Sequence, residues 1–262
     1  MPPEPNIFLE RANTASSDEL KLLVHASDEE VLLAVLENPR LEAAHVTLLL
    51  ERLDLSANVL SAVSAQGKWM SSESVRLRLA CHPRTPKRIA LATAKQLYLF
   101  DLVRLSVLPS APADIKRAGE EIIVARLPQL PVGQKLTLAR RGPARVAGAI
   151  LAEGHPQAVK VALNNAHLTE SQLLRVLANS NVPERVVAAI AQHPRWSCRY
   201  NVRMALVRNP HTPFPSAIAF LAQLTWQDLR MIAGTQDLSP HLRKYIEREL
   251  ARELRQEQQD SG

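Results

Sequence analysis

The chain has 262 residues, of which 46% are hydrophobic and only 4% aromatic, and it holds 8 glycines against 18 prolines. Apolar content carried by Leu, Ala and Val suits helix-on-helix packing, and a β-sandwich of this size would hold more Thr, Tyr, Phe and glycine turns. The net charge of +6 is unevenly spread: residues 1–73 hold 5 Lys/Arg and 12 Asp/Glu (−7), whereas residues 74–262 hold 27 and 14 (+13). Composition therefore favours an all-α protein with an acidic first part and a basic body.

Neither a disulfide framework nor a membrane span is predicted. The two cysteines, Cys81 and Cys198, are far apart and form no CxxC pair, which indicates a reduced compartment. The N-terminus MPPEPNIFLE lacks a basic segment followed by an apolar run. The longest stretch without charged residues, 209–227, contains three prolines and only a short apolar part. We expect a cytoplasmic protein of bacterial type with no membrane association.

In chain order, residues 1–16 are predicted to be an irregular N-terminal segment. Residues 17–245 are predicted to form a solenoid of helical repeats, and residues 240–262 a C-terminal capping helix with a frayed tail. The stretch PHLRKYIERELARELRQEQQ (240–259) has apolar residues on one side and charges on the other, as a terminal helix that covers the end of a repeat array requires.

Two segments carry the strongest internal repeat, and they align without gaps. SVRLRLACHPRTP (74–86) and NVRMALVRNPHTP (201–213) both read Val-Arg-x-x-Leu-x-x-x-Pro-x-Thr-Pro. Degraded copies lie around them, at irregular spacing. Since a single helix pair cannot bury its apolar face alone, such copies predict a stack of helical pairs.

Each copy has a physical logic. The residue before proline is pushed out of the α region, so Asn-Pro or His-Pro ends the first helix. Thr85-Pro86 and Thr212-Pro213 are then expected to start the second helix, with threonine as the N-cap and proline at the first position. Histidines at the corners, such as His82, can hydrogen-bond a free carbonyl.

The VR…NPxTP signature resembles the leucine-rich repeat variant family and, more loosely, HEAT-like α-helical repeats, over about residues 28–245. The resemblance implies an α-solenoid, a right-handed superhelix of irregular tandem helical-pair repeats, and no single activity. A founding member of that family holds an iron–sulfur cluster on a group of cysteines. With only Cys81 and Cys198 in this chain, that feature is not carried over.

No catalytic, cofactor or metal site is predicted. GxGxxG, P-loop, HExxH and GxSxG motifs are missing from the sequence, and the eight histidines are scattered. Some HEAT-like proteins are DNA-repair glycosylases that use an acidic residue in a basic groove. No motif here matches them, and a candidate acid such as Asp101 or Asp228 would have to sit inside such a groove.

The basic stretch 135–208, with 11 Lys/Arg and 3 Asp/Glu (+8), gives the candidate polyanion surface. Arginines aligned along a solenoid could follow a phosphate backbone while an aromatic ring stacks on bases. Alternatively, the matching Arg76 and Arg203 are framework residues that bond neighbouring carbonyls, and the aromatic rings are core. The candidates are Arg140, Arg141, Arg145, Arg199, Arg203, Arg208, Trp196 and Tyr200.

Two functions follow from these features. The first is a non-enzymatic scaffold that binds another protein, with an apolar groove near Trp69 and the stretch 214–224. Trp69 is expected in a loop, where an exposed ring would be the candidate contact residue and burial over a helix end is the alternative. The second is nucleic-acid binding through the basic central and C-terminal surface. Self-assembly through the opposite charges of the two ends is a third alternative.

Overall fold

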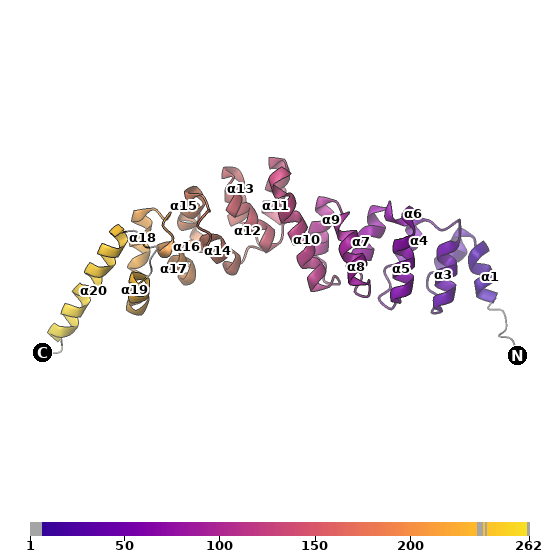
Figure 1. The fold of residues 1–262 in the computed structure, drawn as a ribbon, viewed down its shortest axis with the longest axis horizontal. Coiled ribbons are helices and arrows are strands. Elements are labelled where there is room, and N and C mark those ends of the chain that lie inside the picture. The colour runs from indigo at the N-terminus through magenta and orange to yellow at the C-terminus, as the bar shows by residue number, and fades with distance from the viewer. Residues whose placement is uncertain (1–6, 235–237, 239, 261–262) are drawn as a thin grey trace. The chain divides into compact units, whose positions relative to one another are not determined.

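The computed structural model describes residues 7–234, 238 and 240–260. Every regular element in this part of the chain is a helix, so the all-α prediction is confirmed there (Figure 1). The chain divides into two compact units, residues 1–126 and residues 127–262.

The first unit is a series of short helices and one longer one at its end. They are α1 (Ile7–Thr14), α2 (Ser17–Leu23), α3 (Glu29–Glu37), α4 (Ala43–Leu49), α5 (Ala57–Ala65), α6 (Gly67–Met70), α7 (Glu73–Cys81), α8 (Lys87–Lys95), α9 (Leu99–Val107) and α10 (Ala113–Arg126). The prediction that residues 1–16 are irregular is wrong for residues 7–14, because Ala12 is buried in the core that α1 forms with α3. Residues 1–6 lie outside the described part.

The second unit begins with the 3-10 turn η1 (Leu127–Gln129). Its helices are α11 (Val132–Arg141), α12 (Ala144–Glu153), α13 (Pro156–Leu163), α14 (Glu170–Leu177), α15 (Glu184–Gln192), α16 (Pro194–Ser197), α17 (Tyr200–Arg208), α18 (Phe214–Leu221), α19 (Trp226–Ala233) and α20 (Pro240–Asp260). The long C-terminal helix is thus present, and it packs on α18 and α19.

Helices in each unit alternate between two rows. In the first unit α1 contacts α3 and α3 contacts α5, while on the other side α2 contacts α4, α4 contacts α7 and α7 contacts α9. In the second unit α11, α13 and α15 form one such series and α12, α14 and α17 the other. Aliphatic side chains fill the space between the rows, as the Leu/Ala/Val composition suggests.

Helix bounds in the second unit follow those in the first at a constant offset. The bounds of α15, α16 and α17 are those of α5, α6 and α7 plus 127. Buried residues obey the same offset: Trp69 corresponds to Trp196 and Leu79 to Leu206, all almost inaccessible to solvent. The correspondence extends well beyond the segment 74–86, so each unit can be compared with the other, position by position.

A buried amide or imidazole closes the corner after several helices. Asn38 Nδ2 donates to the carbonyls of Ala12 and Ala15, 2.7 and 3.3 Å away. Asn165, at the position 127 residues later, donates in the same way to Ala139 and Gly142. These side chains supply donors to carbonyls at the ends of α1 and α11, where the helical ladder leaves acceptors without a partner.

Each corner side chain also fixes its own turn. Asn38 Oδ1 accepts from the backbone N–H of Arg40 at 2.8 Å, and Asn209 Oδ1 accepts from that of His211 at 2.9 Å. One side chain thus shapes the turn in which it lies and ties that turn to the preceding one, as required of a buried polar group.

The corner threonines act differently from the expectation. Pro86 and Pro213 occupy the N-cap positions of α8 and α18, and neither cap has a side-chain hydrogen bond. Thr85 and Thr212 instead donate their hydroxyl groups back to the carbonyls of Leu79 and Leu206 in the preceding helix. The Thr-Pro pair therefore ends one helix rather than capping the next.

Asn165→Ala should lower the free energy of unfolding by roughly 2–3 kcal/mol, because it leaves two buried carbonyls and one N–H without their partner. Chemical denaturation followed by circular dichroism measures this. The matched control is the neighbouring Asn164→Ala, an exposed residue, which should change stability by less than about 0.5 kcal/mol. Equal effects of the two substitutions would contradict the role assigned to the corner.

Candidate binding surfaces

Several of the predicted polyanion-binding arginines are bonded within the second unit. Arg203 lies in α17 and its Nε donates to the carbonyl of Ser197 at 2.7 Å. Its counterpart Arg76 donates to the carbonyl of Met70 at 2.8 Å in the first unit. The framework interpretation of this matched pair is confirmed, since each arginine ties a helix to the four-residue helix before it.

Arg199 and the two aromatic candidates form a local cluster. Arg199 pairs with Glu170 at 3.0 Å and lies 5.6 Å from the centre of the Trp196 ring. Trp196 is 1% exposed and donates from Nε1 to the carbonyl of Leu163, so it cannot stack on a base. Tyr200 is partly exposed, and its hydroxyl group donates to Asp228.

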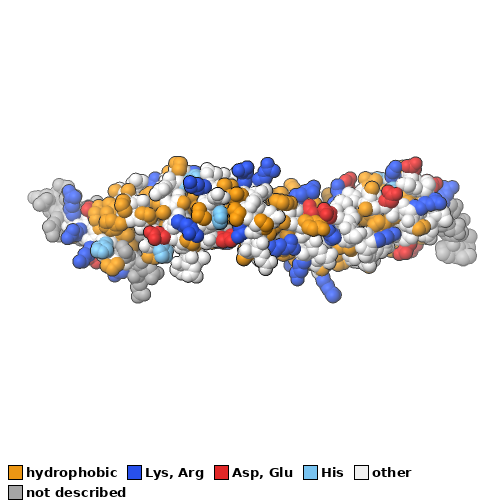
Figure 2. Space-filling view, turned by 90° about the horizontal axis from the view of Figure 1, so that it is seen from above, with side chains coloured by type: hydrophobic (Ala, Val, Ile, Leu, Met, Phe, Trp, Pro, Cys, Tyr) orange, Lys and Arg blue, Asp and Glu red, His pale blue; other side chains and the backbone are white. Residues whose placement is uncertain are grey.

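The remaining arginines are spread over three helices. Arg140 and Arg141 are exposed at the end of α11, and Arg145 is half-buried in the first turn of α12. Arg208, at the end of α17, is half-buried. On the face in Figure 2, Lys and Arg side chains are separated by apolar and neutral ones within each unit, and form no continuous basic strip there.

Part of the positive charge makes hydrogen bonds to the backbone within each unit. Arginine side chains donate repeatedly to backbone carbonyls, where the negative ends of helix dipoles favour cations. Arg126 bridges the carbonyls of Leu97 and Lys95, and Arg195 those of Asn165 and Leu168. Those with a described bond of this kind are Arg40, Arg52, Arg76, Arg84, Arg126, Arg185, Arg195 and Arg203.

The expected loop position of Trp69 is wrong, and of the two alternatives for its side chain the structure shows burial rather than exposure. It lies in helix α6 and is only 4% exposed. The hydrogen bonding of this ring differs between the units. The Leu163 carbonyl accepts from Trp196, whereas the corresponding Leu36 carbonyl accepts from Gln66. Trp69 Nε1 is consequently buried without a hydrogen-bond partner in the described structure.

A groove in the first unit is a concave surface formed by three helices. It crosses α4, α7 and α9 and encloses about 440 Å³. Its floor is apolar, with Leu50, Leu77 and Cys81 nearly buried, and Leu53 rises at its edge with 61% of its surface exposed. The full lining is Thr47, Leu50, Glu51, Leu53, Ser74, Leu77, Arg78, Cys81, His82, Pro83, Arg104, Leu108 and Ser110.

Two ion pairs flank this floor. Arg78 lies 3.0 Å from Glu51, and both side chains are about half exposed. Arg104 lies 3.6 Å from Asp101, with 70% of the arginine side chain but only 15% of the aspartate side chain exposed. The second pair is longer than the 2.7–2.9 Å of a close charge-assisted hydrogen bond, so the Arg104 guanidinium is the more available cation.

Cys81 and His82 form the end of the groove and are both held neutral. Burial raises the pKa of the Cys81 thiol to about 11, although the charge of Arg104 opposes this. A thiol in this state is a poor nucleophile. Burial likewise lowers the pKa of His82, outweighing the hydrogen bond to the Arg52 carbonyl, which acts in the opposite direction.

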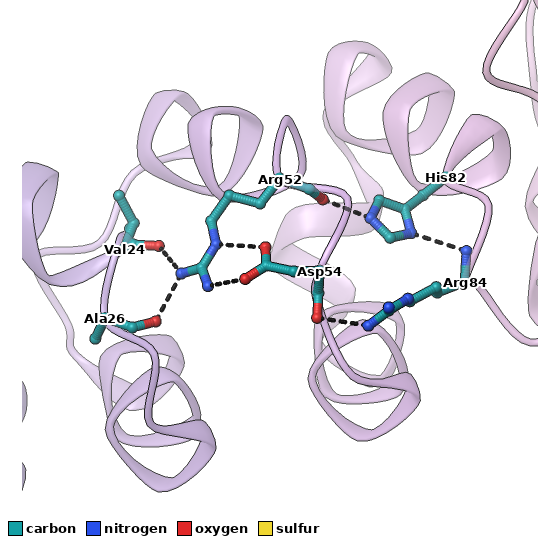
Figure 3. Close-up of polar contacts among 6 residues, drawn as sticks. All are labelled: Val24, Ala26, Arg52, Asp54, His82 and Arg84. Atoms are coloured by element: carbon teal, nitrogen blue, oxygen red, sulfur yellow. Dashed lines mark hydrogen bonds and ion pairs between the residues drawn. The ribbon is translucent and has the colours of Figure 1, made fainter.

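His82 belongs to a chain of hydrogen bonds that joins the turns after α2, α4 and α7 (Figure 3). Its Nε2–H donates to the Arg52 carbonyl at 2.6 Å, and Nδ1 accepts from the backbone N–H of Arg84 at 3.2 Å. Arg52 in turn donates to the carbonyls of Val24 and Ala26 and to both carboxylate oxygens of Asp54. The corner-histidine prediction is confirmed for His82.

Comparison of the two units exposes what the sequence interpretation missed. The framework positions agree, but Arg78, Cys81 and Arg104 correspond to Ala205, Arg208 and Met231. Glu51 and Leu53 likewise correspond to Ala178 and Ser180. Aligning the whole chain at the 127-residue offset would have marked these positions as surface-specific, whereas the alignment of residues 74–86 alone covers only part of the groove.

The expected groove near residues 214–224 is present only as a smaller hollow of about 240 Å³ in the second unit. Leu221, Ala222 and Leu224 line it together with Leu229 and residues of α20. Phe214 is exposed but does not line this hollow.

Asp101 and Asp228 occupy the same position in corresponding helices, α9 and α19. Hydrogen bonds from Thr225 and then Tyr200 lower the pKa of Asp228, which sits in the first turn of its helix. Asp101 lines a recess that also holds Glu73, beside Arg104. Both carboxylates thus have a local role at a helix start, where negative charge is favoured.

Among the described residues, no cluster of three or more His, Cys, Asp or Glu could hold a metal ion. In that same part of the chain, no helix combines the length and apolar character that crossing a membrane requires. Comparison with models of known families, with curated proteins and with solved structures gives no match.

His82→Asn should weaken the dependence of stability on pH. The pKa of His82 in the folded chain lies below its ordinary value of 6.5, so on acidification the unfolded chain takes up the proton at a higher pH than the folded chain does. The free energy of unfolding is therefore highest above pH 6.5 and decreases as the pH falls below that value. Asparagine fits this corner, as Asn209 does in the second unit. Unfolding free energies at pH 7.5 and 5.5 should differ more for the wild type than for the variant; equal differences would contradict the assignment.

Arg203→Ala should lower the free energy of unfolding by roughly 1–2 kcal/mol, because a half-buried charge-assisted bond to Ser197 is lost. Arg175→Ala removes an exposed arginine from α14 and should change stability by less than about 0.5 kcal/mol. Thermal and denaturant unfolding of both variants distinguish a framework arginine from a surface one, and an unchanged stability of Arg203→Ala would remove the framework assignment.

Proposed function

We propose that the chain is a non-enzymatic scaffold that binds another protein through the groove across α4, α7 and α9. The scaffold itself is an α-solenoid of irregular tandem helical pairs, in keeping with the resemblance to leucine-rich repeat variant and HEAT-like proteins. The alternation of helices in two rows and the 127-residue correspondence support this architecture. The observation that carries the function is the open, apolar-floored groove.

Groove chemistry favours a peptide segment as the bound group. A floor of Leu50 and Leu77 offers burial to aliphatic or aromatic side chains, and Leu53 adds exposed apolar surface beside it. Charged groups on both flanks, Glu51–Arg78 and Asp101–Arg104, can fix the register of a chain with polar side chains. A volume of about 440 Å³ accommodates a few side chains.

Nucleic-acid binding remains the alternative, now with weaker support. Arg203 is bonded to the backbone, Arg199 is paired with Glu170, and Trp196 is buried. Arg140 and Arg141 are the exposed candidates that still favour it. We assign the scaffold to a reducing, cytoplasmic compartment, because Cys81 and Cys198 are both free thiols.

The test is a selection of random 12-residue displayed peptides on the immobilised full-length chain, beside fluorescence anisotropy with single- and double-stranded oligonucleotides. We expect enriched peptides whose binding survives a wash at high salt, because apolar burial is not screened. Oligonucleotide binding should be weak and no different in Arg140→Ala/Arg141→Ala. No peptide enrichment, together with steeply salt-dependent oligonucleotide binding lost in that variant, would replace the scaffold by the alternative.

A further inference from the structure

Residues at corresponding positions of the two units can be compared. Those that are the same and make equivalent hydrogen bonds in both units build the fold, and those that differ belong to the surface of one unit. The corner residues Asn38 and Asn165 and the helix-tying Arg76 and Arg203 occur in both units in the same bonds. Arginines 78 and 104, in contrast, correspond to an alanine and a methionine in the second unit. The helices form in both units, so the fold does not require either arginine at these positions.

Cys81 also differs between the units. The second unit carries Arg208 at this position, a far larger side chain at the end of the corresponding helix α17. In the first unit the small thiol lines the groove together with Leu50 and Leu77.

The exposed charge on the α9 side of the floor is that of Arg104. Its side chain is 70% exposed, whereas its partner Asp101, 3.6 Å away, is only 15% exposed. On the α4 side, Arg78 is closely paired with Glu51 and is less available.

We propose that the groove is specific for peptide segments of a partner protein in which an aliphatic or aromatic side chain stands close to a carboxylate. The apolar side chain lies on Leu50, Leu77 and Cys81, and the carboxylate pairs with Arg104. This specificity rests on the proposed scaffold function and adds the chemistry of the partner to it.

The test uses the same 12-residue display library on the full-length wild type and on Arg104→Met, which carries the second unit's residue at that position. Wild-type selection should enrich Asp or Glu within a few positions of a Leu, Ile, Val, Met or Phe, and Arg104→Met should lose this acidic preference. Arg175→Ala, in α14, is the arginine control and should select the same peptides as the wild type. Since Arg104 is largely exposed, its removal should leave the unfolding midpoint nearly unchanged.

A double-mutant cycle on one enriched peptide then identifies the pair. Replacing its acidic residue by the amide should weaken binding about 10-fold to the wild type and less than about 2-fold to Arg104→Met, because an interaction that is already lost cannot be lost again. Enriched peptides that lack an acidic residue, or an equal loss on both proteins, would overturn this specificity and leave the scaffold function standing. No enrichment on any of the proteins would overturn both.

Discussion

Carbonyl groups at the ends of short helices need donors, and the fold depends on how they are supplied. A chain of many short helices has many C-terminal helix ends, and each leaves four carbonyl groups without a partner inside the helix. Asn38, Asn165 and Asn209 reach back about one helical pair to such carbonyls, and His82 does the same with an imidazole. Because each of these side chains also fixes its own turn, one buried polar group positions two neighbouring corners.

Arginine supplies most of the remaining donors, and this changes the meaning of the net charge. A pI near 9.6 suggests a polyanion-binding protein, yet eight arginines among the described residues donate to backbone carbonyls. A guanidinium group with several N–H donors can satisfy two carbonyls and a carboxylate at once, as Arg52 does with Val24, Ala26 and Asp54 (Figure 3). These eight of the 32 Lys and Arg residues therefore have a structural role in addition to their charge.

The two units use one framework for two different surfaces. Trp69 and Trp196 are buried at corresponding positions, but their hydrogen bonds differ. In the second unit Trp196 itself donates to the Leu163 carbonyl, whereas in the first unit Gln66, which corresponds to His193, donates to the equivalent carbonyl. Positions outside the framework diverge, as Cys81 and Arg208 do at the ends of the corresponding helices α7 and α17.

The helical class, the prolines that follow helix ends and the carbonyl-bonding arginines could be predicted from the sequence, whereas the hydrogen bonds of Thr85 and Thr212 could not. Proline and asparagine act locally, through the conformation of one or two residues, and aliphatic periodicity reports which helix side is buried, so His82 and the pair Arg76/Arg203 could be interpreted correctly. Whether a particular side chain is exposed depends on how the helices pack, and this could not be predicted from the sequence. Trp69 follows a short loop-like sequence, but packing against its neighbours buries it in α6.

The groove also depended on tertiary structure, because residues from three separate helices meet there. Glu51, Arg78 and Arg104 are unremarkable surface residues in their own segments, and only the contacts of α4 with α7 and of α7 with α9 bring them around one floor. Local sequence patterns report the neighbours along a helix, whereas a binding surface depends on distances between helices, and these are set by how the whole unit packs.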